Sequence, residues 1–159
     1  MKRLMILLIA AGAVAVPATA AVFGRPGDHA LLAAVSGTGT SFASGTATAS
    51  GDVVRGTTFA SGHFSLSLST TWSSAKTFTR THDDKTLSVS CAPATASLTL
   101  TAGSTTKTLS LTGRTCSLTF DGTARYGFMG RDSTSHAGAF LREKGTTVRG
   151  LVGAFAMPH

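Results

Sequence analysis

Residues 86–120 read "TLSVSCAPATASLTLTAGSTTKTLSLTGRTCSLTF", a run in which large apolar residues alternate with serine and threonine. The same alternation occurs upstream in "HFSLSLS", residues 63–69. Side chains two positions apart lie on the same face of a β-strand, and β-branched threonine suits a solvated strand face. The pattern therefore predicts antiparallel strands that pack on one face and meet water on the other.

Turn signals separate the alternating runs at short intervals. They are "HDDK" at 82–85, "AGST" at 102–105 and "DGTA" at 121–124. Asp, Gly and Ser are the residues that tight turns favour, and no helical period is found after residue 20. We therefore expect an all-β domain of about ten short strands. It would be an antiparallel β-sandwich or a small β-barrel, because an open sheet of that size would expose long edges.

The N-terminal 20 residues have the three parts of a secretory signal peptide. Lys2 and Arg3 provide a positive start, residues 4–16 are apolar, and Ala18-Thr19-Ala20 is a small-residue cleavage site. This order predicts export, with the mature chain beginning at Ala21. The mature chain then divides into an N-terminal arm, 21–35, and a single all-β domain, 36–159. The glycine-rich residues 36–51 are either weakly packed strands or a flexible lead-in.

The chain is basic. Its formal net charge is +7, and removal of Lys2 and Arg3 leaves 12 basic and 7 acidic residues, a net charge of +5. Dispersed charge is typical of a solvated surface; the alternative is attraction to anionic envelope polymers or lipid headgroups. Export and the absence of a basic run argue against nucleic acid as a partner. The dispersed basic residues include Arg80, Lys107, Arg114, Arg125, Arg142 and Arg149.

The chain has two cysteines, Cys91 and Cys116. In an exported protein such a pair predicts a disulfide, because the compartment is oxidising. Three strand spacings of about 4.8 Å would put the two cysteines too far apart in a flat four-strand meander, since a disulfide needs Cα atoms within about 7 Å. We therefore expect residues 87–91 and 116–120 to pair or face each other directly.

One segment contains the residue types of a serine hydrolase. In "GRDSTSHAG", residues 130–138, Asp132, Ser135 and His136 fall within five positions. No G-x-S-x-G elbow is present, and neighbouring residues on extended backbone point to opposite faces. The segment is better interpreted as a hairpin loop in which Asp132 caps its own backbone. A small secreted hydrolase that uses this region is kept as an alternative.

Other chemistry is weakly supported by spacing. Three of the histidines, His63, His82 and His136, with Asp83 and Asp84, show none of the pair spacings that make a local metal site. The sequence thus predicts no catalytic residue, metal ligand or cofactor site. A second alternative is a barrel that binds a small apolar ligand between phenylalanine walls. Those walls would be the phenylalanines at 42, 59, 64, 78, 120, 128 and 140.

The glycine-rich opening, the Leu/Thr strands, "LTGRTC" at 111–116 and "REKGTTVRGLVG" at 142–153 carry a resemblance at the level of pattern. The chain resembles small secreted β-rich proteins of GC-rich bacteria. The resemblance covers most of the mature chain and implies a fold class and export, with no activity attached. We therefore expect an exported, non-catalytic structural or binding protein of the cell envelope or extracellular space.

Overall fold

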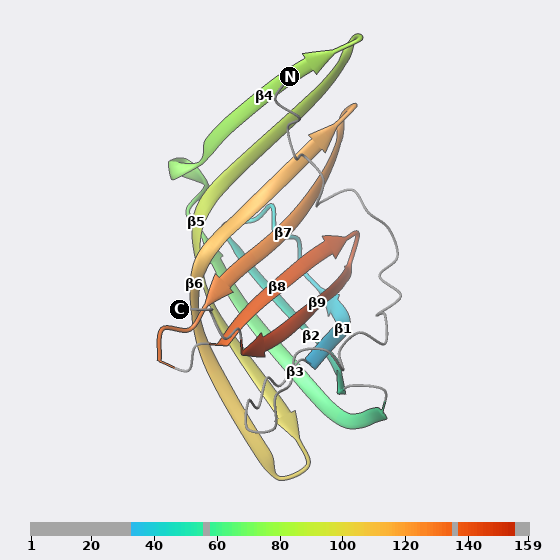
Figure 1. Cartoon of the computed structure of the whole chain (residues 1–159), viewed down its shortest axis with the longest axis vertical. Helices are drawn as coiled ribbons and strands as arrows, with labels where there is room; N and C mark the ends of the chain where they lie inside the picture. The colour runs from blue at the N-terminus through green and yellow to red at the C-terminus, as the bar shows by residue number, and fades with distance from the viewer. Residues whose placement is uncertain (1–32, 56–57, 135–136, 155–159) are drawn as a thin grey trace.

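The structure, a computed structural model, describes residues 33–55, 58–134 and 137–154. The predicted signal peptide, Ser135 and His136 lie outside these residues. Nine strands and one short 3-10 turn, η2 (Trp72–Ser74), make up the described chain (Figure 1). The strands are β1 (Ala33–Gly39), β2 (Thr46–Arg55), β3 (Thr58–Thr70), β4 (Lys76–His82), β5 (Lys85–Ala102), β6 (Thr105–Phe120), β7 (Thr123–Arg131), β8 (Ala137–Lys144) and β9 (Thr147–Ala154).

The strands form a closed antiparallel β-barrel. Their order is β3-β2-β1-β9-β8-β7-β6-β5-β4, and a further pairing of β3 with β5 closes eight of them into a ring. The expected all-β fold is confirmed, and the structure selects the barrel over the sandwich. Residues 36–51 form the rest of β1, the loop after it and the first part of β2, and β1 itself begins at Ala33, inside the predicted arm.

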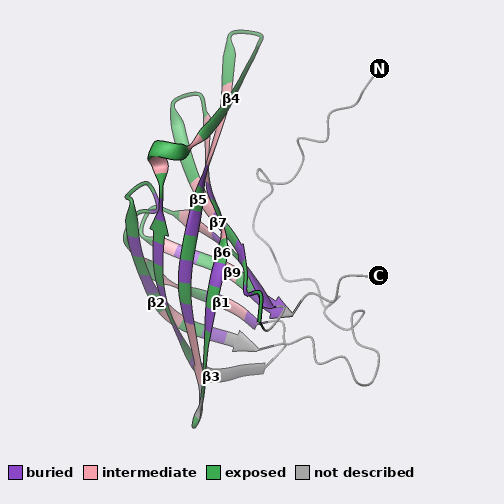
Figure 2. Ribbon diagram, turned by 90° about the vertical axis from the view of Figure 1, so that its left-hand side faces the viewer, coloured by how far each residue is buried: buried purple, intermediate pink, exposed green. Residues whose placement is uncertain are grey.

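The barrel is filled by side chains from every strand of the ring. Figure 2 shows buried and exposed residues alternating along the barrel strands that face the viewer, as the sequence pattern predicted for 63–69. Alanine and valine line the core in β1, β2 and β9, leucine or phenylalanine in β3, β6 and β7, and both alanine and leucine in β5 and β8. The largest fully buried side chains are Phe42, Phe128, Leu68, Leu98, Leu109, Leu111 and Leu141.

The hairpin β5–β6 is longer than the sequence predicted, because each expected pair of short strands is one continuous strand. Its register is unbroken from Leu87↔Phe120 to Ala102↔Thr105. The lower half of β5, Ala94–Ala102, pairs with β3, and the upper half, Lys85–Cys91, pairs with β4. The upper half therefore rises above the ring as an extension, with β4 at its edge (Figure 1).

The apolar pattern changes face where this extension begins. In β5 the buried positions are the even ones from Ala92 to Leu98, whereas Leu87 and Val89 occupy odd positions. In β6 the buried positions are odd up to Thr115, whereas Leu118 is at an even position. Because the register is unbroken, the large apolar residues of the extension stand on the outer face. The interpretation that every alternating run packs its apolar face inward is therefore wrong for 87–91 and 116–120.

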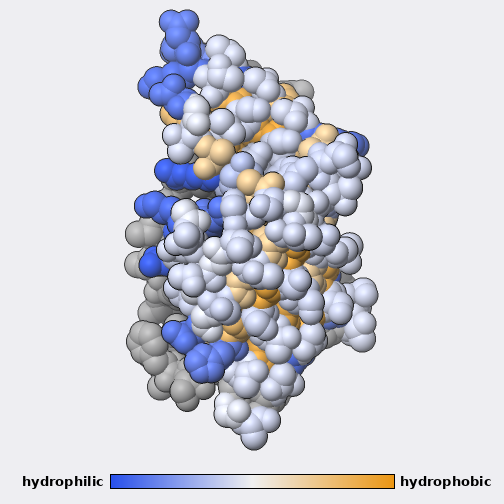
Figure 3. All heavy atoms as spheres, turned by 180° about the vertical axis from the view of Figure 1, so that it is seen from behind, coloured by the Kyte–Doolittle hydropathy of each residue, from blue (hydrophilic) through white to orange (hydrophobic). Residues whose placement is uncertain are grey.

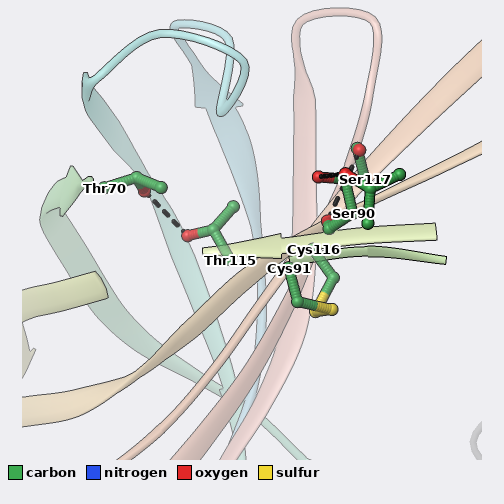
Figure 4. Close-up of a disulfide and its surroundings, with 7 residues drawn as sticks. Thr70, Ser90, Cys91, Thr115, Cys116 and Ser117 are labelled. Carbon is green, nitrogen blue, oxygen red and sulfur yellow. Dashed lines mark hydrogen bonds between the residues drawn. A yellow bond between two sulfur atoms is a disulfide. The ribbon is translucent and has the colours of Figure 1, made fainter. Parts of the chain in front are cut away.

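Cys91 and Cys116 form a disulfide at the level of this change. They are direct cross-strand partners in β5 and β6, with 4.1 Å between their Cα atoms. The predicted pairing of 87–91 with 116–120 is confirmed. Figure 4 shows the disulfide on one side of the β5–β6 ribbon and Ser90 and Ser117 on the other. Just inside the ring, buried Thr115 shares a hydrogen bond of 2.8 Å with Thr70.

The loop between β1 and β2 caps the end of the barrel from which the extension rises. Phe42, at the middle of this loop, is completely buried in the core. Glu143, near the end of β8, accepts a hydrogen bond from the backbone N–H of Phe42 and another, of 2.8 Å, from the hydroxyl of Ser41. The carboxylate thus holds the loop so that the phenylalanine ring closes this mouth of the barrel.

Candidate functional site

Asp132 has a structural role in the turn between β7 and β8. One carboxylate oxygen accepts a hydrogen bond of 2.8 Å from the N–H of Thr134, and the other accepts one of 3.0 Å from the N–H of Ser110 in β6. The N–H of Asp132 itself donates to the carbonyl of Ala137. This arrangement agrees with the predicted capping turn. The other two residues of the hydrolase hypothesis, Ser135 and His136, lie outside the described residues.

Of the candidate metal ligands His63, His82, His136, Asp83 and Asp84, the structure brings together only His82 and Asp83 within the described residues, and His63 pairs instead with Asp52. His136 lies outside the described residues. His63 Nδ1 lies 3.3 Å from Asp52, and His82 Nε2 lies 3.2 Å from Asp83. The four side chains are exposed. Within 33–55, 58–134 and 137–154, no three His, Cys, Asp or Glu side chains are grouped closely enough to hold a metal ion.

The phenylalanines do not form a common ligand wall. Phe42, Phe64 and Phe128 are buried in the core. Phe78, Phe120 and Phe140 are 59%, 48% and 42% exposed on the outside of the sheet. The side chain of Phe59 lies outside the described part. The hypothesis of a lumen lined by these seven residues is therefore wrong for the three outer ones, because their strands present them away from the barrel axis.

One side of the barrel carries a neutral hydroxyl wall, which we define as the outer faces of β2, β3 and the lower halves of β5 and β6. Its exposed residues are almost all serine and threonine, as in the pair Thr99 and Thr108, whose hydroxyls lie 3.0 Å apart. Two shallow depressions open onto this side. Figure 3 views the molecule from behind and shows mostly pale groups of intermediate hydropathy, with hydrophobic residues visible between them in a band through the middle and strongly hydrophilic residues mainly at the margins.

The opposite side is a cationic apolar wall, defined as the outer faces of β4, of residues 85–93 in β5 and 114–120 in β6, and of β7, β8 and β9. The strand register places its residues in rows that cross the sheet. One row is Phe78, Val89, Leu118 and Arg125. The next is Lys76, Cys91, Cys116, Gly127, Arg142 and Arg149. The third is Pro93, Arg114, Met129, Phe140 and Leu151.

These rows gather two kinds of residue that are scarce elsewhere on the described surface. All five large hydrophobic residues that are exposed stand on this wall. Nine of the ten lysine and arginine residues whose side chains are described also stand on this wall. The exception is Lys107, which lies on the same face of β6 as the buried Leu109 and Leu111. The five hydrophobic residues are Phe78, Phe120, Met129, Phe140 and Leu151.

The acidic residues of the described chain lie away from these rows. Asp83, Asp84 and Asp121 occupy the tips of hairpins, and Asp52 is on β2. Glu143 accepts hydrogen bonds from the β1–β2 loop, and buried Asp132 accepts them from the amides of Ser110 and Thr134 in the turn after β7. Within the described residues, no lysine or arginine of the wall forms a salt bridge. Arg142 and Arg149 are direct partners across β8 and β9, and like charges placed opposite each other destabilise a sheet. This concentration of unneutralised positive charge is the chemically distinctive feature of the described surface.

Sequence reasoning missed this wall. It treated the basic residues as dispersed, and it assigned the apolar residues to the core. The available signal is the change of phase at Cys91–Ala92 and at Thr115–Cys116, where the apolar alternation shifts by one residue in both strands. A one-residue shift moves each later apolar side chain to the other face of the sheet.

The comparisons with known proteins supply no relative. The chain matches no family model, no curated protein and no solved structure. The candidate site therefore rests on the geometry of this molecule.

Proposed function

We propose that this chain is an exported, non-catalytic binding protein of the cell envelope or extracellular space, and that its cationic apolar wall binds anionic envelope material. The observation that carries the proposal is the placement of nine of ten described basic side chains on one side of the barrel. Positive charge concentrated on one face creates a local field that attracts polyanions and anionic surfaces.

Export is supported by two independent features. The first 20 residues have the order of a signal peptide, and Cys91 and Cys116 form a disulfide, which persists in oxidising compartments. Within the described residues, no helix has the length and hydropathy to span a membrane. The cell envelope of bacteria is rich in phosphate and carboxylate groups, and these are the anions that arginine and lysine recognise.

The test is retention of the mature chain, residues 21–159, on isolated bacterial envelope fractions at low and high salt. We expect retention at low ionic strength and release at about 1 M salt, because the Debye length falls from about 10 Å at 0.1 M to about 3 Å at 1 M. The double variant Arg142→Gln/Arg149→Gln should lose several-fold in retention. Lys107→Glu is the matched control, since it lowers the net charge by the same two units away from the wall.

The outcomes separate a surface effect from a net-charge effect. If both variants lose retention equally, binding follows net charge and the assignment to this wall is wrong. If the unaltered chain is not retained at low salt, the proposed function itself fails.

A further inference from the structure

We infer that the cationic apolar wall docks on an anionic lipid bilayer surface, with its basic side chains at the headgroups and its exposed hydrophobic side chains in the headgroup–acyl boundary. This inference rests on the proposed function and names the partner of the same surface. A polyanion in water requires only the charges, so the apolar side chains between them need a separate explanation.

The apolar side chains on this wall are large, exposed and grouped. Met129 is 64% exposed and Phe140 42%, and the two are direct partners across β7 and β8. Leu151 continues the row on β9, and Arg114 stands opposite Met129 on β6. Grouped exposed apolar residues on a protein surface mark an interaction site. None of these side chains belongs to the barrel core.

The extension repeats the same composition. Phe78 on β4 and Phe120 on β6 are exposed. Half-buried Val89 on β5 stands opposite both Phe78 and the half-buried Leu118 of β6. Arg80 stands opposite Leu87, which in turn stands opposite Phe120. Cations therefore accompany the apolar groups within each part of the wall rather than forming a separate patch.

This mixture is the chemistry that an anionic membrane interface recognises. Aromatic and aliphatic side chains enter the boundary between headgroups and acyl chains, while arginine and lysine lie along the surface and attract anionic headgroups. Each basic residue near such a surface adds attraction that falls off within a Debye length. Long basic side chains also extend their charge past neighbouring apolar groups, so the two kinds of contact are compatible in adjacent rows.

The remainder of the molecule is suited to the water side of such a complex. The hydroxyl wall of β2, β3 and lower β5–β6 carries neutral serine and threonine residues such as Ser65 and Ser67, which remain hydrated. A second copy of the chain is a poorer partner for the cationic wall, because pairing two such walls would bring Arg142 and Arg149 against the same charges of the other copy.

The experiment measures partition of the mature chain onto vesicles of phosphatidylglycerol and phosphatidylcholine, onto vesicles of phosphatidylcholine alone, and onto inorganic polyphosphate. We expect binding to the anionic vesicles and at least tenfold weaker binding to the neutral ones. Met129→Ser/Phe140→Ser should lower binding to the anionic vesicles about tenfold, because two apolar side chains no longer leave water. Met129→Leu/Phe140→Leu is the matched variant and should retain binding.

Three other results would overturn the lipid inference. If the serine variant binds anionic vesicles as well as the unaltered chain does, the wall responds to charge alone; the lipid inference is overturned, and the proposed function stands. If neither vesicles nor polyphosphate bind, both fail. If sedimentation shows that the unaltered chain self-associates and that the serine variant does not, the apolar rows form an interface between copies, which also overturns the inference.

The serine and leucine variants replace exposed side chains, so both should retain the fold. Their far-ultraviolet circular dichroism and unfolding midpoints provide the check. The polyphosphate arm gives a second check, since both variants keep every basic residue and should bind polyphosphate as tightly as the unaltered chain.

Discussion

Arg142 and Arg149 stand directly opposite each other on β8 and β9, on the outer face of the barrel. Two like charges in this position oppose sheet formation, and within the described residues neither has an acidic partner. We therefore expect Arg149→Glu to increase the free energy of unfolding by about 0.5–1 kcal/mol, because an opposite-charge cross-strand pair replaces a repulsive one.

Urea denaturation of the unaltered chain and of Arg149→Glu measures this difference. The same variant should bind anionic vesicles and polyphosphate more weakly than the unaltered chain. Greater stability combined with weaker binding would show that the arginine pair serves binding at the expense of the fold. A loss of stability in Arg149→Glu would contradict the repulsion on which the prediction rests.

Phe42 and Phe78 form a natural pair for testing which aromatic residues stabilise the fold. Phe42 is fully buried at the capped mouth of the barrel, and Phe78 is 59% exposed on β4. Phe42→Ala should reduce the free energy of unfolding by about 3–5 kcal/mol, because it leaves a cavity in the core. Phe78→Ala should change it by no more than about 0.5 kcal/mol, as is usual for surface substitutions.

Chemical denaturation of the two alanine variants gives both values. If both variants lose the same free energy of unfolding, the outer apolar residues belong to the core. The assignment of Phe78 to an exposed cationic apolar wall would then be wrong. The comparison uses one residue type at two sites, so the chemistry of the substitution is the same in both.

Asp132 should be a stability residue. Asp132→Ala removes the acceptor of the Ser110 and Thr134 amides, and unpaired amides away from water are costly. We expect a loss of about 1–3 kcal/mol in the free energy of unfolding. Asp132→Asn keeps one acceptor oxygen, so its free energy of unfolding should lie between that of the unaltered chain and that of Asp132→Ala.

Asp52→Ala is the control for this series, because Asp52 forms an exposed pair with His63 and such pairs contribute about 0–1 kcal/mol. Hydrolysis of an activated ester by the unaltered chain is measured alongside stability. A hydrolytic activity that disappears in Asp132→Asn while stability is kept would restore the hydrolase alternative.

The disulfide should stabilise the chain mainly through its unfolded state. A closed loop of this size contributes about 3 kcal/mol in the chain-entropy model, so Cys91→Ser/Cys116→Ser should lower the free energy of unfolding by about that amount. Reduction of the unaltered chain should lower its unfolding midpoint to the same extent as the double variant. An unchanged midpoint in both experiments would show that the long β5–β6 hairpin holds the two strands together without the bond.

Much of the local structure could be predicted from residues alone. Asp83, Asp84 and Asp121 have positive φ angles at hairpin tips, where aspartate and glycine are favoured, so "HDDK" and "DGTA" identified real turns. Phe64, Leu66 and Leu68 face the core as their spacing predicts. The cysteines lie at paired positions, because strand spacing left few other ways to bring them within reach.

The candidate site could not be predicted in the same way. Leu118 and Leu111 have the same neighbours in sequence, alternating with serine and threonine, yet Leu111 is buried and Leu118 stands on the outer face. Period-two alternation fixes which residues share a face and leaves open which face meets the core. That choice depends on where β5 and β6 rise above the ring, beyond which no opposite wall covers them.

The turns, the paired cysteines and the all-β class could be predicted from the residues, because these depend on near neighbours and on the geometry of a single chain segment. The barrel itself depends on strand pairing between distant segments. The same pairing brings Lys76, Arg114 and Arg149 onto one wall with Met129 and Phe140. The physical reason is closure: the pairing of β3 with β5 bends the sheet into a ring, and the ring assigns one face of each strand to the core and the other to the surroundings.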